Sequence, residues 1–224
     1  MLIPSIDRMG GRIVQLERGE ELRLAFDDFD YWIERFSKYP LVQLIDLDAA
    51  KRTGHNRTLI EQIAKRLPVQ VGGGIRSGAD AETLINAGAR RVILGSVLFN
   101  PDGIDTKTAA AISAQIGPDQ FVAAIDTKAG KIAVRGWADN VNVTPAQAIG
   151  ALDPYCGAFL YTHVDTEGTM RGFPIDVACE LRPLTSRQLI VAGGIRDRSE
   201  IDALDSFGVD AVAGMAVYSG LLVT

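Results

Sequence analysis

Short apolar runs recur along the whole chain and alternate with stretches of helical character. The runs show no polar alternation, which is typical of strands buried on both faces of a parallel sheet. Eight such strands are expected, over Leu2–Ile6, Leu41–Ile45, Val69–Val71, Arg91–Leu94, Phe121–Ile125, Ala158–Tyr161, Gln188–Val191 and Asp210–Ala213. Helices are expected over Phe29–Lys38, Leu59–Arg66, Asp80–Ala87, Lys107–Gln115 and Glu200–Phe207. This alternation predicts a closed barrel or an open doubly wound sheet.

An internal repeat favours the closed barrel. Val71–Arg76 reads Val-Gly-Gly-Gly-Ile-Arg, and Val191–Arg196, 120 positions later, reads Val-Ala-Gly-Gly-Ile-Arg. Asp7 and Asp126, which follow the first and fifth predicted strands, are 119 positions apart. Four βα units repeated twice predict an eight-stranded (β/α)8 TIM barrel, whereas an open sheet has no comparable reason to repeat at half its length.

The repeat implies one domain over residues 1–224, made of half-barrels of roughly 1–118 and 119–224. Two polar, charged stretches, Gln15–Asp28 and Lys128–Asn142, follow the first and fifth predicted strands. We expect both to be long loops at the catalytic face, where mobile covering loops are common.

Composition narrows the classes of function. The chain has 224 residues, of which 47% are hydrophobic and 23% charged, and its net charge is −5. An acidic chain without a run of Lys or Arg is not expected to bind nucleic acid. No apolar stretch reaches the ~18 residues of a membrane span, and the start of the chain does not resemble a signal peptide. A cytoplasmic monomer is expected, with Cys156 and Cys179 as buried reduced thiols.

Glycine turns follow corresponding strands in both halves. Glycine lets the backbone approach an anion closely, and a following helix start adds partial positive charge. Tight βα turns also need glycine for structure alone, but two pairs of turns favour phosphate binding at two sites. The candidate phosphate-binding residues are Gly73, Gly74, Arg76, Gly95 and Ser96 in the first half, and Gly193, Gly194, Gly214 and Met215 in the second.

Aspartates at the ends of opposite strands are the candidate acid–base pair. Asp7 and Asp126 are expected at the mouth of the barrel, facing each other, although helix capping is the common role of such residues. Two carboxyls in unlike environments can serve as acid and base. Thr162, ending the sixth strand, is expected to position a hydroxyl or a carboxylate, or only to make a backbone hydrogen bond.

Other polar residues near the predicted mouth have two interpretations each. Arg135 and Trp137 are expected to bind an anion and stack on a heterocycle, or to form an exposed pair on the rim. Asp46 is expected to orient a loop or a substrate ribose. His163 follows Thr162 and should face away from it. No spacing typical of metal ligands occurs.

Together these motifs resemble the histidine-biosynthesis isomerases, which act on phosphoribosylformimino-5-aminoimidazole carboxamide ribotide. The resemblance covers Met1 to about Tyr218. It rests on these segments: Leu2–Asp7, Gly11–Val14, Asp46–Ala50, Val69–Arg76, Arg91–Gly95, Ala124–Asp126, Arg135–Trp137, Gly168–Thr169 and Ala192–Ile195.

The resemblance implies an Amadori rearrangement of an aminoaldose to an aminoketose, without metal or organic cofactor. It implies Asp7 as the base that moves the C2 proton. It implies Asp126 as the acid that helps to open the ribose ring, with Thr162 assisting. The implied partner is a small substrate carrying two phosphates, in agreement with the two glycine sites.

Two departures from the family pattern leave alternatives open. The family usually has an acidic residue after the threonine, whereas this chain has His163. The family usually has Asp-Gly-Thr, whereas this chain has Glu167-Gly168-Thr169. Gly168, which this chain shares with the family pattern, is a candidate substrate-binding residue. One alternative is a bifunctional isomerase that also acts on phosphoribosylanthranilate, with Arg18 and the Arg135–Trp137 loop receiving the anthranilate carboxylate. The other is a catalytically weakened barrel that only binds phosphorylated ribosides or a partner.

Overall fold

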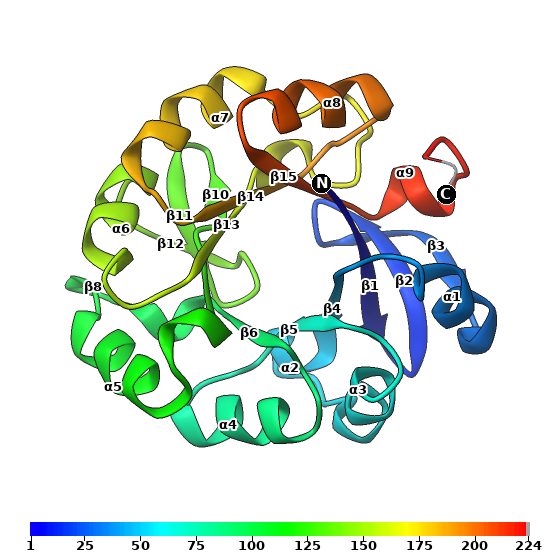
Figure 1. Ribbon diagram of the computed structural model, residues 1–224, viewed down its shortest axis with the longest axis horizontal. Coiled ribbons are helices and arrows are strands. Elements are labelled where there is room, and N and C mark those ends of the chain that lie inside the picture. The colour runs from blue at the N-terminus through cyan, green and yellow to red at the C-terminus, as the bar shows by residue number, and fades with distance from the viewer. Residues whose placement is uncertain (223–224) are drawn as a thin grey trace.

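Eight parallel strands form a closed ring in the computed structural model, which describes residues 1–222 (Figure 1). The strands follow one another around the ring in chain order, and the last pairs with the first through Ile3 and Val212. Helices cover the outside of the ring. The prediction of a (β/α)8 barrel is therefore confirmed, and the open sheet is excluded.

The ring strands are β1 (Leu2–Met9), β4 (Val42–Asp46), β5 (Val69–Gly72), β6 (Arg91–Leu94), β9 (Phe121–Ala124), β13 (Ala158–Thr162), β14 (Gln188–Ala192) and β15 (Val209–Ala213). The helices are α1 (Phe29–Phe36), α2 (Leu47–Lys51), α3 (Arg57–Ala64), α4 (Gly78–Asn86), α5 (Thr106–Ile116), α6 (Pro145–Leu152), α7 (Ile175–Leu181), α8 (Arg198–Ser206) and α9 (Met215–Tyr218). A short hairpin joins β7 (Phe99–Asn100) to β8 (Gly103–Ile104).

The predicted strands and helices agree with these bounds to within two residues at each end, with one exception. Strand β1 continues three residues beyond the expected Ile6, to Met9. The extension exists because β1 pairs on one side with β4 in parallel and on the other with an antiparallel neighbour, Arg12–Glu17 (β2). The continuation raises the end of β1 above the ring.

The two long loops expected from the sequence are instead antiparallel ribbons. In the first half, β2 pairs with Glu21–Phe26 (β3). In the second half, Thr127–Lys128 (β10), Lys131–Val134 (β11) and Asp139–Val141 (β12) form a small sheet. A ribbon that stands above the barrel exposes one face to water, so its sequence is charged and resembles a loop. The prediction of loops was wrong for this reason.

The interior of the barrel has an apolar layer above a polar floor. Ile3, Val122, Leu160 and Ile190 belong to the inner apolar cluster. Below them a chain of hydrogen bonds crosses the ring, and it joins Gln43, Gln70, Arg91, Gln188 and Asp210 in that order. Each of these five side chains is therefore hydrogen-bonded to a neighbour in the chain of bonds, although one guanidinium nitrogen of Arg91 is buried without a partner among the described residues.

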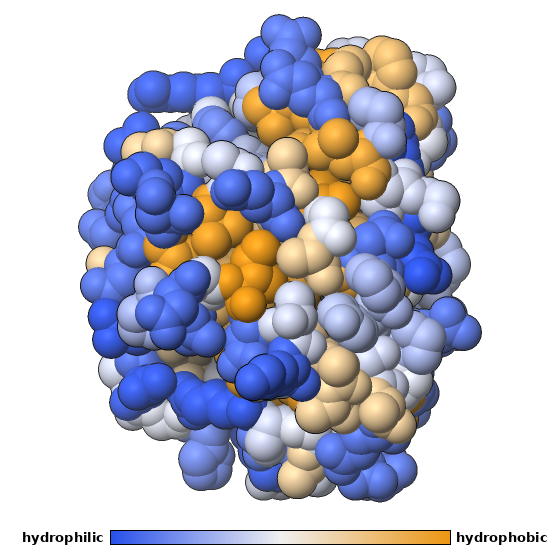
Figure 2. All heavy atoms as spheres, turned by 90° about the vertical axis from the view of Figure 1, so that its left-hand side faces the viewer, coloured by the Kyte–Doolittle hydropathy of each residue, from blue (hydrophilic) through white to orange (hydrophobic). Residues whose placement is uncertain are grey.

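The outer layer packs the helices against the ring. Buried residues of the helices, such as Ile60 and Ile63 in α3, belong to the large outer cluster together with the outward side chains of the strands. Figure 2 shows the side of the barrel that carries α5 and α6. Hydrophilic side chains dominate its margins, and hydrophobic ones gather toward the middle of the view.

The last helix, α9, anchors the first ribbon to the barrel. Tyr218 of α9 packs at ring-centroid distances of 5.2 Å from Phe26 and 4.3 Å from Trp32. Arg8 lies beneath this aromatic group, and its guanidinium carbon is 3.9 Å from the centre of the Phe29 ring. The aromatic cluster fixes the ribbon β2–β3 over the mouth of the barrel.

Candidate active site

The carboxyl ends of the ring strands surround a cavity of about 430 Å³. This end of a (β/α)8 barrel carries the catalytic residues, and the volume suits a small organic ligand. Most of the residues selected from the sequence line the cavity: Asp7, Gly73, Gly74, Arg76, Gly95, Ser96, Asp126, Arg135, Trp137, Thr162, Gly168, Gly193, Gly194, Gly214 and Met215.

Two selected residues lie outside that lining. Asp46 is buried and caps α2: its carboxylate accepts hydrogen bonds from the backbone N–H of Ala49 (3.1 Å) and of Asn56 (2.7 Å). It therefore organises the β4–α2 loop, and a contact with the substrate ribose is not supported. Arg18 is exposed at the tip of the β2–β3 ribbon, where its backbone N–H donates to the carbonyl of Glu167 at 3.0 Å.

Asp7 stands on β1 with its side chain in the cavity. The Ser5 hydroxyl, two residues earlier on the same face of the strand, donates to its Oδ1 at 2.7 Å. Burial raises the pKa of Asp7 to about 6, although the hydrogen bond from Ser5 acts in the opposite direction. Asp7 is thus mainly ionised at neutral pH, with a pKa close enough to neutrality for a general base.

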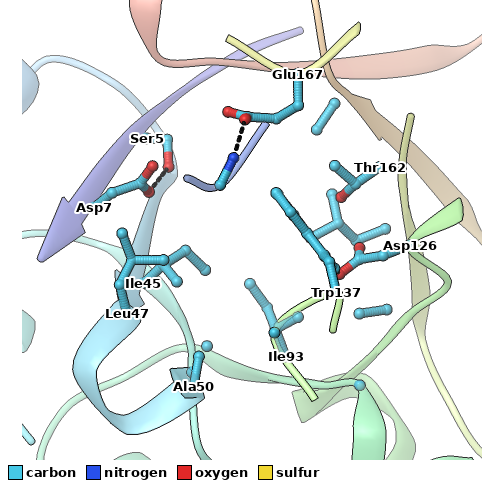
Figure 3. A pocket seen from close by; sticks show the side chains of 18 of the residues that line it. Ser5, Asp7, Ile45, Leu47, Ala50, Ile93, Asp126, Trp137, Thr162 and Glu167 are labelled. Carbon is cyan, nitrogen blue, oxygen red and sulfur yellow. Dashed lines mark hydrogen bonds between the residues drawn. The ribbon is translucent and has the colours of Figure 1, made fainter. Parts of the chain in front are cut away.

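Asp126 follows β9, the strand opposite β1 in the ring. Its Oδ2 accepts a 2.7 Å hydrogen bond from the indole N–H of Trp137. Burial raises the pKa of Asp126, while hydrogen bonds from Trp137 and Thr162 lower it. In Figure 3, Trp137 lies in the middle of the cavity, between Asp126 and Thr162 on one side and Asp7 on the other.

Glu167 lies beyond the end of β13 and points into the same cavity (Figure 3). Its Oε2 accepts a 3.2 Å hydrogen bond from the backbone N–H of Gly19, at the tip of the ribbon. Burial, followed by repulsion from the Asp7 carboxylate, raises the pKa of Glu167 to about 8. Glu167 is therefore protonated at neutral pH and can donate a proton. In the sequence it stood out only as a departure from the family pattern.

The glycine turns occupy opposite sides of the cavity, since β5 and β14 are opposite in the ring. Gly73 has φ +98°, and a Cβ there would lie 2.2 Å from the carbonyl oxygen of Asp46. Gly193 has φ +103°, and a Cβ there would lie 2.3 Å from the carbonyl oxygen of His163. Both positions therefore require glycine, because the backbone there packs closely against the end of the preceding strand. This close packing places the two turns at equivalent positions in the cavity wall.

The loop from Arg135 to Trp137 bends sharply over the first-half turns. All three of its residues have positive φ, and the backbone N–H of Arg135 donates to the Ser96 hydroxyl at 2.7 Å. The Arg135 side chain forms an ion pair with Asp139. Left-handed backbone at non-glycine residues is costly and is often found at functional sites.

Sequence reasoning missed five polar residues of the lining. They are Ser5, Gln15, Gln43, Lys51 and Arg52. Ser5 could have been predicted, because strand alternation places it on the same face as Asp7. Lys51 and Arg52 end helix α2, and only the fold brings this helix to the mouth. The Lys51 ammonium donates to the carbonyl of Gly19 at 2.7 Å.

The histidines and cysteines lie outside this lining. The His163 ring faces Tyr161 and Phe173, and its Nδ1 is 2.8 Å from the Thr166 hydroxyl. Cys156 is buried as expected, but Cys179 is exposed. Within residues 1–222 no cluster of His, Cys, Asp or Glu could hold a metal ion. In the same part of the chain no helix is long and apolar enough to cross a membrane.

A closed barrel with facing carboxyls and paired glycine turns at its mouth defines a (β/α)8 enzyme acting on small anionic substrates. Comparison with known proteins agrees with this class of enzyme. The profile of the family described as "Histidine biosynthesis protein" matches residues 1–222. The chain belongs to this family.

Three relatives share the name 1-(5-phosphoribosyl)-5-((5-phosphoribosylamino)methylideneamino)imidazole-4-carboxamide isomerase. The Methanocaldococcus jannaschii protein is 35% identical, over 99% of this chain and 95% of its own. The Deinococcus radiodurans protein is 33% identical, over 99% and 94%. The Thermus thermophilus protein is 32% identical, over 98% and 94%.

Proposed function

We propose that this chain isomerises an aminoaldose carrying a phosphate at each end to the corresponding aminoketose, the reaction for which its relatives are named. One observation carries the proposal. Asp7 and Glu167 share one cavity between opposite glycine turns, and their pKa values are raised to about 6 and about 8. Carboxyls with separated pKa values provide a base and an acid at the same pH.

The first step is opening of the ribose ring. Glu167, protonated at neutral pH, donates its proton to the ring oxygen while the C1–O bond breaks. The lone pair of the amino nitrogen then forms a C1=N bond, so the substrate becomes a protonated imine. Asp7 next removes the proton from C2, and the electrons of the C2–H bond form C1=C2 while the C1=N pair returns to nitrogen.

The resulting enaminol becomes the ketone by proton transfer. C1 gains a proton, the C2 hydroxyl loses one, and C2=O replaces C1=C2, so no atom or electron is gained or lost overall. Asp7, now protonated, can return its proton to C1. The carboxylate of Glu167 can accept the hydroxyl proton, which restores both groups for the next turnover.

In this proposal Asp126 binds and orients the substrate, whereas the resemblance implies that it is the acid. Burial is the largest influence on the pKa of Asp126 and raises it, while the hydrogen bonds that Trp137 and Thr162 donate to the carboxylate act in the opposite direction. These two hydrogen bonds orient the Asp126 carboxyl, which suits binding of a substrate hydroxyl or amino group. Glu167 is the better proton donor because its pKa is higher than neutral pH.

Neither alternative function has an observation in its favour. The Arg135 side chain pairs with Asp139, and Arg18 is exposed outside the lining, so the two arginines that the bifunctional alternative requires are not placed to receive an anthranilate carboxylate. The lining described for residues 1–222 retains an acid and a base, which a binding-only barrel would not need. We also propose that the barrel acts as a cytoplasmic monomer, because one chain supplies every residue of the site.

A steady-state assay of the purified protein on the bisphosphorylated aminoaldose tests the proposed function. Wild-type protein should turn the substrate over, and Asp7→Asn should lower kcat by at least ~10² while substrate binding survives. Wild-type protein that binds the substrate without turnover would show a binding barrel. Near-full activity of Asp7→Asn would remove the assigned base.

A further inference from the structure

The positive charges of the cavity lie on one side of it. Within the lining described for residues 1–222, the lysine and arginine residues are Lys51, Arg52, Arg76 and Arg135. All four flank the first-half turns, which follow β5 and β6. The second-half turns, which follow β14 and β15 on the opposite side of the ring, have no lysine or arginine in the same lining. The two glycine sites are therefore electrostatically unequal.

The four cations differ in how free their side chains are. Arg135 pairs with Asp139, and Lys51 donates to the carbonyl of Gly19. Arg76 donates one guanidinium N–H to the carbonyl of Ala49 at 2.9 Å, which leaves its charge uncompensated. Within the described part of the chain, the Arg52 side chain has neither an ion pair nor a hydrogen bond. Arg52 and Arg76 are the two cations available to an anion.

The backbone at Arg52 supplies an independent reason to assign it a function. Arg52 is the C-cap of α2 and has φ +61° and ψ +29°, in the left-handed region. Glycine is the residue that normally ends a helix in this conformation, because it has no Cβ to clash. An arginine here is strained, and its side chain lines the cavity. Strain of this kind at a site points to a role for the side chain.

The acid and the base lie nearer the other pair of turns. Asp7 is on β1, the neighbour of β15 in the ring, and Glu167 follows β13, the neighbour of β14. The ribose that reacts therefore lies toward the second-half turns. The phosphate of the other ribose, which takes no part in the chemistry, then reaches the first-half turns across the cavity.

We propose that Arg52, assisted by Arg76, is a phosphate-binding residue that makes the first-half turn the stronger of the two phosphate sites and selects substrates with a second, remote phosphate. A guanidinium matches a phosphate with two parallel N–H donors, which adds geometry to charge. The orientation of the substrate in this proposal rests on the proposed function, whereas phosphate binding by Arg52 does not.

The first test is kinetic and uses Arg52→Gly, which suits the left-handed backbone and should fold. Because the contact is made equally in the ground state and the transition state, we expect KM for the bisphosphorylated aminoaldose to rise at least fivefold and kcat to stay within twofold. Arg57→Gln is the matched control. Arg57 is an exposed cation five residues away, paired with Glu61 and outside the cavity lining, and its loss should leave KM unchanged.

The second test needs no turnover. Inorganic phosphate is titrated while the melting temperature is followed, and its apparent affinity should fall at least fivefold in Arg52→Gly and in Arg52→Gln, but not in Arg57→Gln. Unchanged phosphate affinity in both Arg52 variants would overturn the proposal even if the wild-type enzyme is active. Reduced affinity together with an inactive wild-type protein would leave the Arg52 site standing and remove the proposed function.

Discussion

Asp7 and Glu167 owe their chemistry to what surrounds them. Asp7 keeps a hydrogen bond from Ser5, so its pKa rises only to about 6. Glu167 is half-buried and faces the Asp7 carboxylate, and the loss of solvation together with this repulsion raises its pKa to about 8. The longer side chain of Glu167 reaches the backbone N–H of Gly19. What appeared in the sequence as a departure from the family pattern is, in the structure, the proton donor that we propose.

The acid assignment predicts different pH profiles for two substitutions. Glu167→Gln should lower kcat by at least ~10² and abolish the alkaline limb of the kcat/KM profile, because that limb reports ionisation of the acid. Asp126→Asn should raise KM and keep both limbs. Steady-state kinetics between pH 5 and 9.5 checks both variants. Loss of the alkaline limb in Asp126→Asn instead would return the acid role to Asp126.

Arg8 is the residue least explained by the fold. It is fully buried, and in the described part of the chain its three guanidinium nitrogens have no hydrogen-bond partner. Burial lowers the pKa of Arg8 to about 10, although Asp46 and Asp48 oppose this effect. An unpaired buried polar group reduces stability.

We therefore expect Arg8→Met to raise the free energy of unfolding by about 1 kcal/mol, since methionine keeps the contact with Phe29 at lower desolvation cost. Urea denaturation at pH 7 measures the change. A loss of ~2 kcal/mol or more would show instead that Arg8 compensates the buried charge of Asp46.

At the scale of elements, the sequence predicted correctly those strands whose two faces lie in the same environment. Ring strands are buried on both faces, so each appears as an uninterrupted apolar run, and even the short β5 and β6 were located. The ribbons β2–β3 and β10–β12 have one face in water, so they were taken for loops. The closed ring decides which carboxyl groups meet, and it also decides that α2 brings Arg52 to the mouth of the barrel. Neither fact can be obtained from the local sequence pattern.

The tip of the β2–β3 ribbon predicts a sensitive position. Gly19 has φ +72°, and a Cβ there would lie 2.7 Å from the Trp137 ring. Gly130, at the tip of the equivalent ribbon in the second half, has φ +76° and open space around it. Alanine strains the backbone similarly at both sites, by about 1 kcal/mol.

Only Gly19→Ala should displace Trp137 and disturb the hydrogen bond to Glu167. We expect it to lower kcat/KM at least tenfold, and Gly130→Ala to stay within twofold of wild type. Initial-rate kinetics of the two variants decides the point. Equal effects in both would assign the change to backbone strain alone.

For the whole molecule, the raised pKa values link catalysis to stability. The ordinary pKa values of the Asp7 and Glu167 carboxyls are 3.8 and 4.5, and folding raises them to about 6 and about 8. At pH values between the unfolded and the folded pKa of each group, the folded state binds more protons than the unfolded state. The free energy of unfolding therefore falls as pH rises from roughly 4 to 8. The site thus destabilises the barrel at the pH where it works.

Glu167→Gln should remove most of the decline above pH 6 and stabilise the protein at pH 8.5 by about 1 kcal/mol, equivalent to about 2–4 °C in melting temperature. Thermal unfolding at pH 5.5, 7 and 8.5 provides the measurement. Glu34→Gln, on an exposed position of α1, is the matched control and should leave the pH dependence unchanged. A variant that retains the wild-type decline would contradict the assigned pKa of Glu167.

The position of Trp137 gives the barrel a built-in optical signal. The chain has two tryptophans. Trp32 is buried in the aromatic cluster with Tyr218 and is not part of the cavity lining, while the indole of Trp137 is hydrogen-bonded to Asp126 inside the cavity. A ligand that enters must change the polarity around Trp137 and leave Trp32 undisturbed. In a Trp32→Phe background, emission from a single fluorophore would therefore follow ligand arrival and departure in real time, without any label.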